Sequence, residues 1–409
     1  LSKVEAGKLA LDVAPFDIRK SVSQIRLVWR ETALLKGVEL AVEIDPATPT
    51  WLAGDDIRVR QILRNLISNA LKFTDAGRVL APDGELWCVW NSHLRYRPLL
   101  ERTVGPKPAQ LMGQMAFEGG RIIRERIAKY NINCDLKDGG VFAAFTQKQM
   151  GHLEAQKKLW ERYGHTQLEL MDSKRIREVV GTENYIGGML DMSGGHIHPL
   201  NLALGEAAAV ESLGGVIYEQ SPAVRIERGA NPVVHTPKGR VKAKFIVVAG
   251  NAYLGNLVPE LAAKTMPCGS QVIATEQLSA EMAKSLIPND YCVEDCNYLL
   301  DYFRLTGDNR LIYGGGVVYG ARDPANIEAI IRPMMLKTFP QLKNVKIDFA
   351  WTGNFLLTLS RLPQVGRIGD NIYYSQGCSG HGVTYTHLAG KVLGEALRGQ
   401  AERFDPFAG

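Results

Sequence analysis

The feature that most constrains the fold is an uninterrupted apolar run, Phe245-Ile246-Val247-Val248-Ala249, which ends in Gly250. A strand that is apolar at every position is expected to be buried on both faces, as strands of parallel sheets are. A glycine at the carboxyl end of such a strand lets the backbone approach a ligand closely. The run therefore predicts an α/β fold with a parallel sheet.

A second strand, Ile372–Ser375, runs into the glycine-rich segment Gln376-Gly377-Cys378-Ser379-Gly380-His381-Gly382-Val383-Thr384. A helix is expected to follow from about Thr386 to Leu397. A strand, a glycine-rich turn and a helix N-terminus together offer free backbone amides in a concave arrangement that suits an anionic group. The alternative is a tight turn that binds no ligand.

Hydrophobic patterning predicts several further elements in this part of the chain. They are helices over 110–130, 148–163 and 200–213, a strand within 134–145, a loop over 187–199, a strand over 216–219 and a hairpin over 233–244. His196 and His198 in the loop could suggest a metal, but no third ligand is evident. We expect a glycine-rich crossover loop there and no metal site.

Length and composition limit the broad class of the protein. The chain has 409 residues, 45% hydrophobic and 22% charged, with a net charge of +5, which is enough for two or three domains. No block of Lys or Arg suggests a nucleic-acid partner, and no apolar run approaches the roughly 18 residues of a membrane span. Six irregularly spaced cysteines and no recognisable signal peptide favour a cytoplasmic protein with reduced thiols.

The first eighty residues have a different pattern from the rest. Val38–Ile44 alternates as a strand does, and Asp56–Phe73 has the apolar spacing of an amphipathic helix. Asn65 and Asn69 are four residues apart, so their amides share one face of that helix.

The stretch from Asp55 to Thr74 resembles the N box in the ATPase domain of sensor histidine kinases. The resemblance covers residues 1–79 and implies that Asn65, Asn69 and Lys72 would face magnesium and the ATP phosphates. The Asp-x-Gly-x-Gly turn that should follow does not occur, and the first histidine of the chain, His93, lies beyond this segment. We therefore interpret residues 1–79 as a kinase fragment with a vestigial nucleotide site.

From Leu99 to Phe407 the sequence resembles the flavin-dependent amine oxidases of the D-amino-acid-oxidase superfamily, and among them the gamma-glutamylputrescine oxidoreductases. Two long blocks carry the resemblance, His196–Glu206 and Leu359–Gly366. The family binds FAD, which would be non-covalent here because no cysteine stands between Cys296 and Cys378.

The resemblance also implies functional residues. Val224 would lie near the adenine, Ala249 and Gly250 near the ribose and diphosphate, and Gly380, His381, Gly382, Val383 and Thr384 along the isoalloxazine. His381 is the candidate catalytic residue, with a purely structural role as the alternative. Tyr302 and Arg304 are candidate substrate contacts, although Arg304 could instead form a surface salt bridge.

One departure from the family pattern affects the cofactor. The family opens with a strand, turn and helix that carry Gly-x-Gly-x-x-Gly, and this spacing is absent from the 409 residues. The predicted fold is an incomplete FAD-binding Rossmann-like domain plus an antiparallel substrate domain, mainly over 266–350, within 99–409. A junction over 80–98 joins it to the kinase fragment.

The implied activity is oxidation of a small-molecule amine. Hydride would pass from the amine carbon to flavin, the imine would hydrolyse to an aldehyde, and oxygen would become peroxide. We expect impaired activity because the glycine-rich unit is absent. The alternatives are a non-catalytic chimeric remnant and an ATP-binding signalling module. The oligomeric state and the exact amine stay open.

Overall fold

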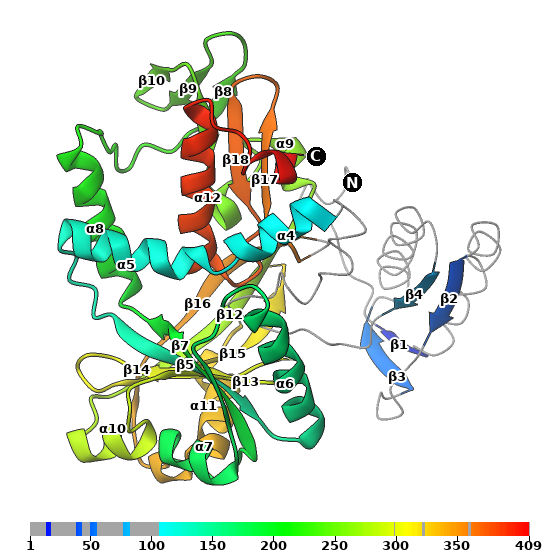
Figure 1. Cartoon of the computed structure of the whole chain (residues 1–409), viewed down its shortest axis with the longest axis vertical. Helices are drawn as coiled ribbons and strands as arrows, with labels where there is room; N and C mark the ends of the chain where they lie inside the picture. The colour runs from blue at the N-terminus through cyan, green and yellow to red at the C-terminus, as the bar shows by residue number, and fades with distance from the viewer. Residues whose placement is uncertain are drawn as a thin grey trace. The chain divides into compact units, whose positions relative to one another are not determined.

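The computed structural model describes residues 14–17, 38–42, 50–54, 77–81, 106–297, 299–320, 324–358 and 361–408. The chain divides into two compact units, Leu1–Glu85 and Leu86–Gly409 (Figure 1). Each unit is described by itself.

The first unit contains two pairs of short strands. β1 (Ala14–Asp17) pairs antiparallel with β3 (Trp51–Gly54), and β2 (Val38–Val42) pairs parallel with β4 (Gly77–Ala81). The predicted strand at Val38 is therefore confirmed. The predicted helix over 56–73, with Asn65, Asn69 and Lys72, lies outside the described residues.

An eight-stranded sheet in the order β16-β12-β15-β14-β13-β5-β7-β6 organises the second unit. Its strands are β5 (Lys137–Ala144), β6 (Leu168–Met171), β7 (Gly187–His196), β12 (Thr265–Thr275), β13 (Cys292–Asp295), β14 (Tyr302–Leu305), β15 (Leu311–Tyr319) and β16 (Ile347–Thr358). All neighbours pair antiparallel except β13 and β5, which are parallel.

Successive side chains of a strand point to opposite faces of the sheet, and helices pack against both faces here. On β5, Val141 joins the core formed with α7 (Ser173–Val179), α10 (Ala280–Leu286) and α11 (Ile327–Thr338). Its neighbour Phe142 points to the other face and packs against Trp160 of α6 (Gln147–Glu161). Figure 1 shows α7, α10 and α11 gathered at one side of the sheet.

A smaller three-stranded sheet has the order β11-β18-β17, formed by β11 (Ile246–Val248), β18 (Ile372–Gln376) and β17 (Gln364–Ile368). β11 and β18 are parallel, as the sequence predicts. α12 (Gly382–Leu397) packs against β17 and β18, and the sheet of β8 (Arg225–Glu227), β9 (Val233–Thr236) and β10 (Gly239–Lys242) packs against β11. The predicted hairpin over 233–244 is thus confirmed.

The other helices of the described residues are α4 (Pro106–Met115), α5 (Glu118–Tyr130), α8 (Pro199–Ser212), η2 (Asn251–Tyr253), α9 (Pro259–Ala262), η3 (Pro340–Leu342) and α13 (Asp405–Ala408). The predicted helix over 110–130 is interrupted between α4 and α5, and the helices predicted at 148 and 200 are confirmed as α6 and α8.

Two predicted elements are wrong. The segment over 187–199, expected to be a loop, forms strand β7 between β5 and β6. Its glycines permit close strand packing, since a Cβ at Gly188 would lie 2.5 Å from the carbonyl oxygen of Phe142. The segment over 216–219 is not a strand, and all of its residues are exposed.

The apolar run was expected to be buried on both faces of its sheet, and it is buried on one face only. Ile246 and Val248 are 8% and 7% exposed, whereas Phe245 and Val247 are 45% and 44% exposed. β11 lies at the edge of its sheet, and the face opposite β8 and β9 is open at Val247. The sequence pattern predicts a central strand, but the structure places it at an edge.

Candidate functional site

The carboxyl ends of β11 and β18 meet at one edge of the small sheet. Their parallel register pairs Ile246 with Ile372, so the segments that follow both strands emerge together. Asn251 joins them, because its Oδ1 accepts a hydrogen bond from the Gly377 amide (3.0 Å) and its Nδ2 lies 3.5 Å from the Cys378 sulfur. The structure therefore brings the predicted Ala249–Gly250 segment beside the glycine-rich turn, the place where open α/β sheets bind ligands.

The glycine-rich turn has an unusual backbone. Gly377, Ser379 and Gly380 have φ angles of 70°, 51° and 96°, in the left-handed region that favours glycine. A Cβ at Gly377 would lie 2.2 Å from Thr358 Cγ2, whereas a Cβ at Gly380 would meet no atom within 4 Å. The chain thus packs tightly where the turn begins and leaves open space at Gly380.

The N-terminus of α12 completes this turn. His381 is the N-cap residue, and its side chain makes no capping hydrogen bond. The first amides of a helix have no partner within the helix and carry partial positive charge. The candidate residues Gly382, Val383 and Thr384 form this first turn, so their backbone can bind the electron-rich edge of a ring.

Contacts with α5 and α8 fix the position of α12. The Gly119 backbone of α5 lies so close that a Cβ there would be 2.2 Å from the Thr384 carbonyl oxygen. His387 of α12 hydrogen-bonds to Glu206 of α8 through Nε2 (2.9 Å). That bond and Arg126 of α5, at 3.1 Å, hold the pKa of Glu206 below its usual value, against the opposing effect of burial.

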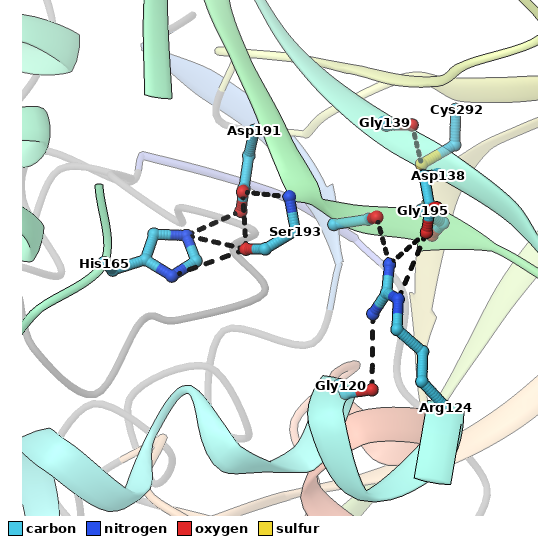
Figure 2. Close-up of polar contacts among 10 residues, drawn as sticks. Gly120, Arg124, Asp138, Gly139, His165, Asp191, Ser193, Gly195 and Cys292 are labelled. Carbon is cyan, nitrogen blue, oxygen red and sulfur yellow. Dashed lines mark hydrogen bonds and ion pairs between the residues drawn. The ribbon is translucent and has the colours of Figure 1, made fainter. Parts of the chain in front are cut away.

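A cavity of about 60 Å³ lies beside this first turn, between α5, β7 and α12. Its lining includes Gly120 and Arg124 of α5, Asp191 of β7, His165, and Thr384. Figure 2 shows the polar contacts along one side of it. Val383 and Thr384, two of the residues that the family resemblance assigns to the isoalloxazine, thus line the cavity.

The polar groups of the cavity bond to one another. Asp191 accepts hydrogen bonds from Ser193 Oγ (2.8 Å) and contacts His165 Nε2 (3.0 Å), and His165 stacks on Phe117 with the ring centroids 4.1 Å apart. Ser193 Oγ lies 3.2 Å from His165 Nε2 and 3.4 Å from its Nδ1, as Figure 2 shows. Asp191, Ser193 and His165 therefore form one hydrogen-bonded cluster.

Arg124 connects α5 to the sheet. Its guanidinium donates to the carbonyl oxygens of Gly194 (2.8 Å) and Gly120 (3.2 Å) and pairs with Asp138 at 2.5 Å. Sequence reasoning missed Arg124, His165, Asp191 and Asn251, because none of them belongs to a recognisable motif. Asn251 alone had a signal, since it follows the strand-ending Gly250.

The candidate substrate residues lie on the eight-stranded sheet. The hydroxyls of Tyr302 on β14 and Ser270 on β12 are 3.0 Å apart. Arg304, two residues further along β14, donates to the Leu305 carbonyl (3.0 Å), and burial lowers its pKa. It forms no ion pair with another described residue, and both its role as a substrate contact and the alternative of a surface salt bridge stay predictions.

Other candidate residues have local structural roles. Val224 is 59% exposed and its amide donates to the His235 carbonyl (2.8 Å), so its adenine contact stays a prediction. His196 hydrogen-bonds to the Asp290 carbonyl (2.8 Å), and His198 accepts from the Asn201 amide at the start of α8 (3.3 Å).

Neither a candidate metal site nor a candidate membrane-spanning helix occurs in the described residues. No group of three or more His, Cys, Asp or Glu in that part of the chain could hold a metal ion. No helix within it is both long and apolar enough to cross a membrane.

Known proteins resemble the two parts of the chain separately. Gamma-glutamylputrescine oxidoreductase of Escherichia coli is 61% identical over 319 residues, which are 78% of this chain and 75% of that protein. The probable oxidoreductase OrdL of Haemophilus influenzae is 40% identical over 75% of this chain and 72% of its own. The sensor protein GacS of Pseudomonas syringae is 45% identical over 80 residues, 20% of this chain and 9% of its own.

Solved structures support the fold. L-proline dehydrogenase from P. horikoshii has a TM-score of 0.64 at 18% identity and covers 84% of this chain and 92% of its own. Glycine oxidase from Geobacillus kaustophilus has a TM-score of 0.61 at 18% identity, over 70% and 79%. Both predicted resemblances and the predicted fold class are thereby confirmed. Because residues 84–396 match the family described as FAD dependent oxidoreductase, the chain belongs to that family.

Proposed function

We propose that the second unit has the catalytic fold of an FAD-dependent amine oxidase whose substrate is gamma-glutamylputrescine or a closely similar amine. The observation that carries this proposal is the 61% identity with the Escherichia coli enzyme of that name over 319 residues. The family match over residues 84–396 includes Tyr302, Arg304 and the glycine-rich turn. The small-molecule partner is accordingly an amine.

The ring half of FAD fits the residues present. The open space at Gly380 and the amides of the first turn of α12 suit the electron-rich edge of an isoalloxazine. When bound, the flavin would accept a hydride from the amine carbon and pass electrons to oxygen. The chain's own residues would orient this reaction: His381 would lie next to the ring, and Tyr302 and Arg304 would hold the substrate.

The adenosine diphosphate half does not fit. A dinucleotide site of this fold needs backbone amides at the first strand, turn and helix of its sheet, and the sequence has no Gly-x-Gly-x-x-Gly. Phe245 and Val247, which precede Ala249 and Gly250 in the chain, are exposed to solvent. We therefore propose that residues 1–409 bind FAD weakly, mainly through the ring site and with little contribution from Ala249 and Gly250, and that the activity is impaired.

The substrate assignment can be tested by restoring the flavin site. A chimera would carry the opening segment of the E. coli relative in place of residues 1–98. We expect it to release peroxide with gamma-glutamylputrescine faster than with sarcosine, glycine or D-alanine. Equal rates with all four compounds would contradict the assigned substrate and leave the family assignment intact.

A further inference from the structure

A carboxyl group and a guanidinium that form no ion pair with another described residue lie on one face of the eight-stranded sheet. Glu294 of β13 is directly opposite Tyr302 of β14 in their antiparallel pairing. Residues that face each other in this way project to the same side. Arg304, two residues beyond Tyr302, projects to that side as well, at a diagonal distance of roughly 7 Å between Cβ atoms.

Each group keeps hydrogen-bonding capacity that no described residue uses. Glu294 Oε1 is fully buried and has no hydrogen-bond partner among the described residues. Burial, and then the neighbouring Asp295, raise the pKa of Glu294 well above its usual range, which favours the neutral carboxyl until a cation binds beside it. Arg304 donates one hydrogen bond to a backbone carbonyl and forms no ion pair with a described residue, while Asp135 and Asp290 raise its pKa against the larger, lowering effect of burial. A ligand that carries both an ammonium and a carboxylate would supply a partner to each group.

Side chains of neighbouring strands extend this face of the sheet away from Glu294 and Arg304. Phe142 of β5 is opposite Glu294 on its other side and belongs to the apolar cluster of Trp160. Tyr302 reaches the Ser270 hydroxyl on β12 at 3.0 Å. β12 continues to Cys268, which is paired with Phe355 of β16.

This surface leads to the glycine-rich turn. Phe355 packs against the apolar cluster that contains Cys378, and the Ser379 amide donates to the Leu356 carbonyl (3.0 Å). The order along the sheet is therefore Arg304, then Glu294 with Tyr302, then Ser270, then the turn beside which the ring would lie. An extended substrate can have its charged head at Arg304 and its reacting amine at the turn.

We propose that Glu294 and Arg304 together bind a zwitterionic α-amino-acid head group, with the substrate's α-ammonium on Glu294 and its α-carboxylate on Arg304. This inference rests on the proposed function, because it assigns the two ends of a gamma-glutamyl amine. It makes Glu294 a specificity-determining residue, and the sequence offered no sign of that role.

The test measures binding and requires neither flavin nor turnover. Two ligands that lack the reacting amine would be titrated into residues 1–409 by calorimetry: gamma-glutamylbutylamide and glutarylbutylamide. They differ only in the α-ammonium group. A charge-assisted hydrogen bond in a buried site predicts that the unmodified protein prefers the gamma-glutamyl ligand by about tenfold or more.

Variants then assign the preference to its residue. Glu294→Gln should bind the two ligands equally, Arg304→Gln should weaken both, and the control Glu281→Gln, on the exposed face of α10, should change neither. Because it replaces a buried carboxyl, whose ionisation burial disfavours, with a neutral amide of similar shape, Glu294→Gln should fold at least as stably as the unmodified protein, which a thermal melt checks.

Several results would overturn the inference. One is an unmodified protein that binds neither ligand or binds both with equal affinity. Another is a Glu294→Gln variant that keeps the preference or binds both ligands more weakly by the same factor. A clear head-group preference in a protein that forms no peroxide, even with its flavin site restored, would instead contradict the proposed oxidase activity and leave this inference standing.

Discussion

At the residue scale, buried carboxyl groups should set how stability depends on pH. Asp295 is 4% exposed and accepts hydrogen bonds from the amide (2.9 Å) and side chain (3.0 Å) of Asn297. Burial nevertheless raises its pKa to about 7, compared with roughly 3.9 when unfolded. The folded state thus retains a proton that the unfolded chain releases, so stability falls as the pH rises from about 4 to about 7.

Asp295→Asn removes this titration. We expect the free energy of unfolding to change less with pH than in the unmodified protein, with a relative gain on the order of 2–4 kcal/mol above pH 7. Urea unfolding at pH 5 and pH 8 measures it, with the exposed Asp370→Asn as control. Parallel pH profiles for Asp295→Asn and the unmodified protein would show that Asp295 ionises normally.

At the element scale, the crossing of α5 and α12 positions the first turn of the ring site. An alanine normally stabilises a helix by roughly 0.5–1 kcal/mol relative to glycine. At Gly119 its Cβ would lie 2.2 Å from the Thr384 carbonyl oxygen, whereas at Gly390 of α12 it would meet nothing within 4 Å. We expect Gly119→Ala to lower the melting temperature and Gly390→Ala to leave it unchanged or raise it. Similar melting temperatures for both variants would contradict the close crossing.

The sequence predicts elements where local patterns and packing agree. The strand at Ile372, the turn and α12 follow from local signals, as does the hairpin β9–β10. β7 was missed because it is buried on both faces and rich in glycine, so no alternation is visible. The edge position of β11 depends on which strands surround it, and a single strand carries no such information.

At the scale of the whole molecule, the candidate site draws on segments far apart in the sequence. Family resemblance assigns Ala249 and Gly250 to the ribose and diphosphate and Gly380 to the isoalloxazine, and Asn251, next to Gly250, bonds to Gly377 of the turn. The sequence cannot reveal that Glu294 is opposite Tyr302, because register is a tertiary property. The same holds for the cavity lined by His165 and Asp191. The domain limits and the roles of the site residues stay predictions.

The central claim at this scale is that the ring half of the flavin site is present and the diphosphate half is not. A lost diphosphate cradle removes several charge-assisted hydrogen bonds, each worth roughly 1.5–3 kcal/mol. Phe245 and Val247, just before the predicted diphosphate contacts Ala249 and Gly250, are exposed to solvent. Two physical consequences follow, weak FAD affinity and a preserved preference for the ring.

The most direct test is the flavin content of the purified protein. Residues 1–409 would be expressed, incubated with excess FAD, passed through gel filtration and examined by absorbance at the flavin bands. We predict far less than one flavin per chain, with riboflavin binding in a parallel titration about as well as FAD. A yellow protein that leaves the column with stoichiometric FAD would contradict the account.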